Sequence, residues 1–293
     1  MCGLLSYAGT PVEQTPALRG LGTCVAYLIF GGFYPKHGAQ HFVDTLKTII
    51  EQNNGKILCN HPVEEIIIKK NCVDAVRVKK QIFKAPVIVS NVNALTLFET
   101  LIKEKKVSQD ALNELQKLPL SNSAIVVHCA VDKDLSKYPS IITHIDNDCH
   151  IAINSAADPS TAPKGKSSVT IFSLGHTYAD IPKRNTDAYK KYKESKEKSI
   201  IKQAESLIPD LSKHIIFTVV ETPQTFERYT GMPKGSLYSF DHCMKNKRPY
   251  FKTPIKGLYL SSASTLYGAG IEAVIMTGMA CAHDICGWKV ETT

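Results

Sequence analysis

Two glycine-rich turns have the residue types and spacing best suited to bind a ligand. One is GGFYPKHG, residues 31–38, and the other is YGAG, residues 267–270; each stands before a segment with helical periodicity. Glycine lets the backbone approach a ligand, and the free N–H groups at a helix start favour a phosphate or an electron-rich carbonyl. Either turn taken alone is more often a plain tight turn.

The second turn also fits the dinucleotide pattern G-x-G-x-x-[GA] through Gly268, Gly270 and Ala273. Such a unit needs a strand, a helix and a second strand over roughly 30 residues, with an acidic residue about 20 positions further on. Here a loop separates the turn from its strand, and the sequence reaches Thr293 too soon. We therefore expect this turn to close a nucleotide-binding domain and not to open one.

The segment HIDNDCH places His144, Asp146, Asp148 and His150 at alternating positions, which would share one face of a strand. A polar solvent-facing strand has the same pattern, and further histidines are not close by in the sequence. No metal site is predicted.

Side-chain nucleophiles have equally little support. The sequence holds neither a G-x-S-x-G elbow nor a P-loop, and Cys129 and Cys281 sit inside apolar runs typical of a core. No catalytic side chain is predicted.

Strand and helix patterns alternate along the chain and include hairpins, which predicts a mixed α/β or α+β architecture. Helices are expected at 42–52, 95–118, 186–207 and 270–286, and strands at 63–68, 73–79, 86–90, 123–132, 167–175, 214–223 and 256–264. The first two strands should form a hairpin, and Asn53-Asn54-Gly55 should end the first helix.

Length and composition fit a globular protein of one large or two ordinary domains: 293 residues, 43% of them hydrophobic, with a net charge of +8. The nine cysteines lack C-x-x-C pairs, which favours reduced thiols and a cytoplasmic location. The lysine-rich segment 183–202 has interleaved glutamates typical of a solvated helix face, and no nucleic-acid-binding motif accompanies it. No apolar stretch reaches the roughly 20 residues of a spanning helix; peripheral membrane contact stays compatible with the charge.

Read in order, five segments resemble the phytoene desaturase-like flavoproteins, a family of carotenoid desaturases, carotene isomerases and retinol saturase within the amine-oxidase-like FAD group. They are YPKHGAQHFVDTL, PVEEIII, APVIVSNVN, ERYTGMPKGSLYSF and GLYLSSASTLYGAGIEAVIMTG. The resemblance implies an incomplete FAD/NAD(P)-binding domain of that type plus an α+β substrate-binding domain. It assigns residues 1–30 to the end of a substrate-side insertion, 31–97 and 235–293 to FAD-domain segments, and 98–234 to the substrate-binding domain.

The same resemblance implies which residues contact FAD. Pro35 and Gly38 match the turn near the flavin, and Val63 matches the valine beside the adenine portion. Ser90 and Asn91 match a strand end close to the cofactor. Gly268, Ala269, Gly270 and Ile271 match the last turn, where helix N–H groups face the pyrimidine side of the flavin ring.

Three departures from the family pattern bear on function. His37 stands where a glycine is common, and Tyr267 stands where a proline is common. The opening G-x-G-x-x-G unit that holds the pyrophosphate is missing, so we expect a C-terminal portion or one half of a split enzyme.

The resemblance implies an FAD-dependent oxidoreductase acting on carbon–carbon bonds of a long hydrophobic isoprenoid, and it covers desaturation, saturation and isomerisation alike. Another chain would supply the Rossmann half. The alternative is a catalytically inactive fragment or interaction module that cannot hold FAD alone, because the pyrophosphate site contributes much of the binding energy.

Overall fold

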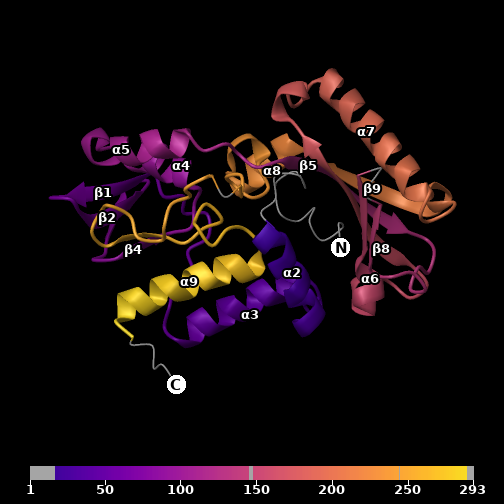
Figure 1. Cartoon of the computed structure of the whole chain (residues 1–293), viewed down its shortest axis with the longest axis horizontal. Coiled ribbons are helices and arrows are strands. Elements are labelled where there is room, and N and C mark those ends of the chain that lie inside the picture. The colour runs from indigo at the N-terminus through magenta and orange to yellow at the C-terminus, as the bar shows by residue number, and fades with distance from the viewer. Residues whose placement is uncertain (1–16, 145–147, 244, 289–293) are drawn as a thin grey trace. The chain divides into compact units, whose positions relative to one another are not determined.

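The chain folds into two compact units, each assembled from two stretches of sequence (Figure 1). The computed structural model describes residues 17–144, 148–243 and 245–288. The first unit comprises Met1–Ile57 and Asn122–Tyr229, and the second comprises Leu58–Ser121 and Thr230–Thr293. Residues 31–57 thus share a unit with 122–229. The predicted division by role, into cofactor and substrate segments, stays a prediction.

An antiparallel five-stranded sheet forms the centre of the first unit, in the order β6-β7-β8-β5-β9. Burial alternates along its strands, as expected for a sheet with one face against a core. The strands are β5 (Ser123–Val131), β6 (Ile141–His144), β7 (Cys149–Ile153), β8 (Ser167–His176) and β9 (Ile215–Glu221).

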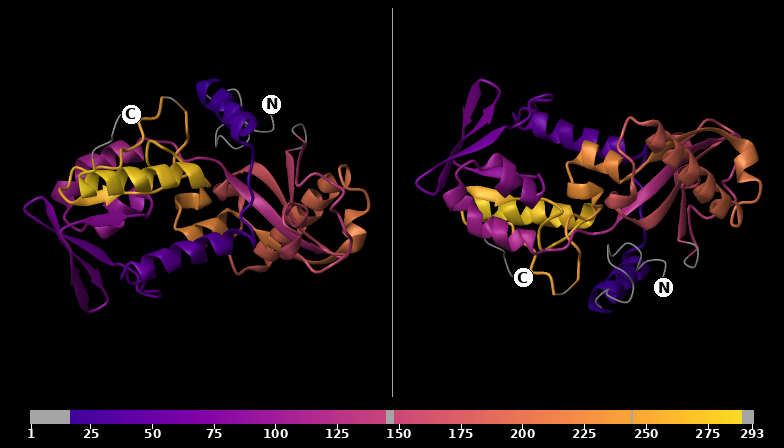
Figure 2. Two further views of the ribbon diagram at one scale, coloured as in Figure 1. Left: turned by 90° about the horizontal axis from the view of Figure 1, so that it is seen from below. Right: turned by 90° about the horizontal axis from the view of Figure 1, so that it is seen from above.

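Helix α7 (Asp187–Glu205) packs on this sheet (Figure 2). Its start agrees with the predicted helix at 186–207, and Thr186 Oγ1 caps it by accepting a hydrogen bond from Tyr189 N at 3.2 Å. The helix buries Ile200 and Ala204 against strand residues that include Ile125 and Ile171. The shorter helices α6 (Asn154–Ala157) and α8 (Pro223–Thr230) belong to the same unit.

Two further helices of the first unit, α2 (Ala17–Phe30) and α3 (Ala39–Gln52), leave apolar side chains exposed. The predicted stop of α3 is confirmed, because Asn53 N bonds back to Ile49 O and Ile50 O at 3.2 Å. Its periodic apolar residues, Val43, Leu46, Ile49 and Ile50, are 45–54% exposed. Helix α3 is therefore amphipathic as predicted, with its apolar stripe uncovered within its own unit.

The second unit combines an antiparallel meander with a parallel pair of strands. The meander is β1 (Glu65–Lys69), β2 (Cys72–Val78) and β3 (Gln81–Lys84). Strands β4 (Ile88–Ser90) and β10 (Leu258–Leu260) pair in parallel. Helices α4 (Ala94–Thr96), α5 (Lys105–Gln116) and α9 (Ile271–Cys286) accompany them, and Leu97, Phe98, Phe240 and Leu258 lie in the core.

The structure adds α2, β6, β7 and α8 to the predicted elements and differs from the prediction at two further places. The hairpin of β1 and β2 is confirmed, but β3 was not predicted because QIFK lacks the alternation of a half-buried strand and is exposed throughout. The single helix expected at 95–118 is instead α4, a π-helical turn at Leu97–Leu101, and α5. Ile102 has extended backbone angles and is fully buried, so packing overrides the helical periodicity there.

The HIDNDCH segment lies at the β6–β7 hairpin, where Asp146 falls outside the described residues. Asp148 Oδ1 lies 3.3 Å from His150 Nε2, and the His150 ring stacks on Phe172 at 4.8 Å. No group of three potential ligand side chains able to hold a metal is found in the described part of the chain. Across these same residues, no helix is long and apolar enough to span a bilayer.

Candidate functional site

The glycine turn before α9 has the backbone conformation that its sequence predicts. Gly268 and Gly270 have φ angles of 97° and 109°, values that L side chains rarely adopt. Gly270 caps the start of α9 without a side-chain hydrogen bond, and Ile271 follows it with 54% exposure. The residues that begin α9 are therefore exposed, as a ligand site at a helix start requires.

A carboxylate modifies the electrostatics of this helix start. Glu272 lies in the first turn of α9, where it stabilises the helix and offsets part of its positive end. The remaining attraction suits a hydrogen-bond acceptor of partial charge, such as a ring carbonyl, better than a full phosphate charge.

Ser90 and Asn91 lie at the carboxyl ends of the parallel strands, beside the segment that leads into the turn. Ser261 N donates to Ser90 O at 2.8 Å, and Asn91 Nδ2 donates to Ser261 O at 2.5 Å. Ligands of open α/β sheets bind outside the carboxyl ends of parallel strands. The structure thus brings these two predicted residues to one end of the sheet with the chain that forms the turn.

A buried network of small polar side chains fixes the loop between β10 and the turn. Asn93 Nδ2 donates to Ser239 Oγ at 2.7 Å, Ser239 Oγ lies 2.9 Å from Ser264 Oγ, and Ala94 N donates to Ser264 Oγ at 3.0 Å. All three polar residues are at most 3% exposed. Sequence reasoning missed this network; its only signal is the runs of Ser and Asn that follow two apolar strands.

The side chains of His242 and Arg248 pack against the turn at Gly268. A Cβ atom at Gly268 would lie 3.1 Å from Arg248 Nη1 and 3.2 Å from His242 Cε1. Arg248 Nη2 also donates to Leu266 O at 2.8 Å. The tight contact gives Gly268 a second reason to lack a side chain, and the sequence alone offers no sign of either partner.

The other predicted cofactor residues divide between the two units. Pro35 and Gly38 belong to the first unit, where Gly38 N donates to Pro35 O at 2.9 Å and Gly38 has a φ of 83°. Val63 belongs to the second unit, precedes β1 and is 38% exposed. Contacts of these residues with a cofactor remain predictions.

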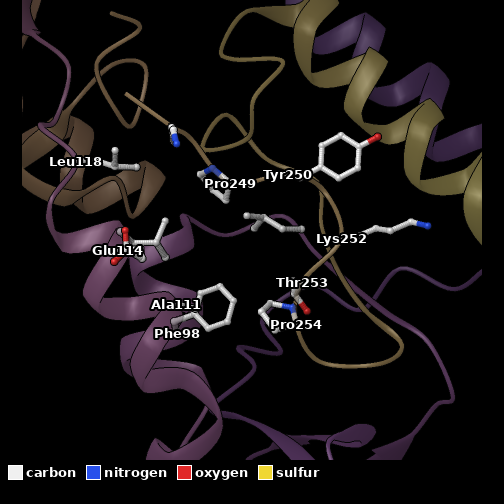
Figure 3. A pocket seen from close by; sticks show the side chains of 12 residues that line it. Phe98, Ala111, Glu114, Leu118, Pro249, Tyr250, Lys252, Thr253 and Pro254 are labelled. Carbon is white, nitrogen blue, oxygen red and sulfur yellow. The ribbon is translucent and has the colours of Figure 1, made fainter. Parts of the chain in front are cut away.

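An apolar cavity of about 180 Å³ lies elsewhere in the second unit (Figure 3). Phe98 and Leu260 are almost fully buried in its wall, and Pro249 and Pro254 close another side. None of the predicted cofactor residues lines it.

Comparison with known proteins gives relatives but no matching family model. The chain is 27% identical over 292 residues to the prolycopene isomerase of Daucus carota, covering 87% of this chain and 44% of the relative. It is 23% identical to the all-trans-retinol 13,14-reductase of Danio rerio (96% of this chain, 53% of the relative). It is also 23% identical to the lycopene-forming phytoene desaturase of Pseudescherichia vulneris (86% and 56%). The chain spans about half the length of the curated relatives it matches.

Two solved oxidoreductase structures have a fold similar to that of this chain. An oxidoreductase from Methanosarcina mazei superposes with a TM-score of 0.69 at 18% identity, covering 96% of this chain and 63% of that one. Cyclohexylamine oxidase from Brevibacterium oxydans gives 0.57 at 12% identity, covering 85% and 52%. The resemblance read from the sequence motifs is confirmed: this chain is similar to the phytoene desaturase-like proteins and has the mixed helix-and-strand fold of amine-oxidase-like oxidoreductases.

Proposed function

We propose that this chain is the C-terminal part of an FAD-dependent oxidoreductase of the phytoene desaturase type, acting on a long isoprenoid. The observation that carries the proposal is the Gly268–Gly270 turn, which presents the start of α9 beside the loop from the carboxyl end of β10. The relatives, whose names describe isomerisation, reduction and desaturation of polyenes, support the substrate class.

The residues of the turn fit a flavin ring. Two positive-φ glycines keep side chains away from the helix start, and the first N–H groups of α9 can donate to a ring carbonyl. Gly268, Ala269, Gly270 and Ile271 would hold the pyrimidine side of the ring, with Ser90 and Asn91 at the adjoining strand end. FAD, when bound, supplies hydrogen transfer to or from the carbon–carbon bond.

The protein's own contribution is then binding and electrostatics. N–H donors aimed at the ring stabilise negative charge that develops there, and they need no reorganisation because α9 holds them. The hydroxyl network through Asn93, Ser239 and Ser264 keeps the loop before the turn in place. The proposal needs no side-chain acid or base, because the cofactor supplies the chemistry.

The outer edge of β4 is where we propose that the Rossmann half joins, from the same protein or from another chain. Strand β4 pairs with β10 on one edge, and no strand of the described residues pairs with its other edge. Val87 and Val89, on one face of the strand pair, are 36% and 47% exposed, so this face is uncovered as well. An open strand edge of this kind readily accepts a further strand.

Peripheral membrane contact is a further part of the proposal. A long isoprenoid substrate resides in lipid, and the net charge of +8 favours anionic headgroups. The C-terminal end of α2 and the residues after it expose Leu28, Ile29, Phe30 and Phe33 by 67–89%. Flotation with anionic vesicles tests this part, and absence of the chain from the vesicle fraction would contradict it.

Flavin absorbance tests the central proposal. The purified chain, titrated with FAD and separated from free cofactor, is expected to retain a bound flavin spectrum. Gly270→Ala should weaken retention, because alanine is strained at a φ of 109°. Gly165→Ala is the matched control, since Gly165 has a φ of 78° in a loop of the first unit with no atom within 4 Å of an added Cβ.

Three outcomes bear on the two hypotheses. Retention that Gly270→Ala lowers and Gly165→Ala does not would support the proposed site. Equal losses in the two variants would contradict it. No flavin retained by the unmodified chain would exclude FAD binding by this chain alone, as the alternative of an inactive fragment or interaction module expects and as a chain that needs the Rossmann half would also show.

A further inference from the structure

The apolar cavity of the second unit lies between helix α5 and the segment that leads into β10 (Figure 3). Its volume of about 180 Å³ is large for a protein interior, where voids wider than a water molecule are few. Phe98, Leu115 and Leu260 line the cavity and are at most 5% exposed. The cavity therefore reaches into the core of the unit.

One wall of the cavity is helical. Ala111, Leu115 and Leu118 have the i, i+4, i+7 spacing that places side chains on one face of a helix, and Leu118 N continues the last turn by donating to Leu115 O at 3.1 Å. Phe98 completes this wall from the π-helical turn Leu97–Leu101. Turns of this kind are rare and are frequently found at functional sites, which distinguishes this wall from ordinary core packing.

The opposite wall is a loop held in place by its own hydrogen bonds. Pro249 and Pro254 lie across the cavity from the helical residues in Figure 3, and each proline fixes its own φ angle. Pro249 O accepts a hydrogen bond from Leu266 N at 2.8 Å, and Phe251 O accepts one from Leu260 N at 2.8 Å. Because neither wall depends on a ligand for its structure, the cavity is preformed.

The charged side chains of the lining stand at the open side of the cavity. Glu114, Lys247 and Lys252 are all exposed. Glu114 Oε1 lies 2.5 Å from Lys117 Nζ, and Lys252 Nζ lies 2.5 Å from Asp284 Oδ1. The cavity therefore holds no buried charge that a ligand of opposite charge would neutralise.

The uncharged polar groups of the lining are satisfied or directed elsewhere. Thr253 Oγ1 donates to Leu258 O at 2.8 Å and accepts from Ile255 N at 3.2 Å. Tyr250 is 48% exposed, and Figure 3 shows its hydroxyl pointing toward α9 and away from Phe98. Within the described part of the chain, none of the buried side-chain polar atoms that lack a partner belongs to this lining. A polar ligand atom would lose its hydrogen bonds to water without replacement, so the cavity selects neutral apolar molecules.

We propose that this cavity binds a small neutral hydrocarbon group of about six to eight carbon atoms, such as a benzene ring. A dry apolar cavity of about 150 Å³ accommodates benzene, and the volume here leaves room for little more. The inference does not rest on flavin binding, because none of the predicted cofactor residues lines the cavity.

Benzene is the probe that tests the proposal, in a titration of the flavin-free chain followed by ligand-observed NMR. Saturable binding is expected. Pyridine, which has the same shape and one polar ring atom, should bind about tenfold more weakly. Naphthalene exceeds the cavity and should bind no more tightly than benzene. The proposal is wrong if benzene does not saturate, if pyridine binds equally well, or if naphthalene binds more tightly, as it would on an open apolar surface.

Variants locate the site. Ala111→Leu fills the cavity from α5 and should weaken benzene binding at least about tenfold. Ala188→Leu is the matched control, because Ala188 is an exposed residue of α7 in the first unit, and it should leave the affinity unchanged. Equal affinities of the two folded variants for benzene would overturn the proposal, as would displacement of benzene by excess FAD, which would place the probe in the flavin site.

Leu118→Ala gives an independent test if Ala111→Leu does not fold. Removing part of the Leu118 side chain enlarges the cavity, so the affinity for naphthalene relative to benzene should rise about threefold. An unchanged ratio in the folded variant would show that benzene binds elsewhere and would overturn the proposal.

Discussion

The backbone N–H of His37 donates to Asp158 Oδ2 at 2.6 Å and so joins the first glycine turn to a loop 121 residues further along the chain. His37 Nδ1 also lies 3.2 Å from Ser160 Oγ. His37 has a φ of 65°, in the left-handed region that favours glycine. His37 therefore stands where related proteins commonly have glycine, at a position whose backbone conformation favours glycine. Its contact with Ser160 stabilises the histidine in that conformation.

Replacement of His37 by glycine should be tolerated, because relief of the positive φ offsets the lost contact and the larger unfolded-state entropy. We expect His37→Gly to stay within about 1 kcal/mol of the unmodified chain in urea unfolding, and His37→Val to lose about 1–2 kcal/mol. Lys36→Gly is the control, since Lys36 is not among the positive-φ residues, and it should lose about 0.5–1 kcal/mol. Tolerance of valine equal to that of glycine would contradict the backbone argument.

Asp158 should make the free energy of unfolding depend on pH. Hydrogen bonds from Ser160, and then from the His37 N–H, lower the pKa of Asp158 in the folded chain. A lowered folded pKa means that the ionised group stabilises the fold above its unfolded pKa, about 3.9, and that this contribution is lost as the pH falls through the folded value. The stability difference between the unmodified chain and Asp158→Asn should therefore be constant near neutrality and shrink below about pH 4.

Urea unfolding between pH 7 and pH 3 measures that difference. Asp110→Asn, an exposed carboxylate on α5, serves as the control for loss of charge. A difference that grows as the pH falls would show that the sign of the Asp158 contribution is wrong.

The cysteines should react with iodoacetamide according to burial. Burial raises the pKa of Cys129 to about 12 and that of Cys149 to about 11, with smaller contributions from Glu197 and Asp148. Only the thiolate is reactive, so both should resist alkylation at pH 8 in the native chain, while exposed Cys59 and Cys286 should be modified. Peptide mass spectrometry with and without urea makes the comparison, and alkylation of native Cys129 as fast as Cys59 would refute it.

Local sequence patterns predicted the elements whose signal is contained in one segment. The start of α7 close to Thr186, the stop of α3 at Asn53 and the burial of Cys129 and Cys281 all follow from neighbouring residues. The supports of the candidate site do not, because Arg248 beneath Gly268 and Ser239 beside Asn93 depend on tertiary packing between distant segments. The sequence predicted that Gly268 and Gly270 form a turn. It did not predict that Arg248 and His242 leave no room for a side chain at Gly268.

Gly257 should tolerate no side chain. It has a φ of 78°, and an added Cβ would lie 2.5 Å from Pro86 O and 2.8 Å from Val73 Cγ2. Because Pro86 O is backbone, the clash cannot be relieved by a rotamer change, and we expect Gly257→Ala to lose more than about 2 kcal/mol. Gly278→Ala in α9 is the control: its nearest neighbour would be Ser261 Oγ at 3.8 Å, so alanine should stabilise the helix by about 0.5–1 kcal/mol.

The Gly257 variant also tests how the strand pair supports the candidate site. Gly257 O accepts a hydrogen bond from Ile88 N at 2.9 Å, at the start of the pairing between β4 and β10. Displacing Gly257 should loosen that pair and, through Ser261 and the loop that follows, the turn at Gly268. Hydrogen exchange should therefore rise at Leu258–Leu260 in Gly257→Ala and not in Gly278→Ala. Loss of stability without faster exchange in β10 would mean that the strain is confined to the contact with Pro86.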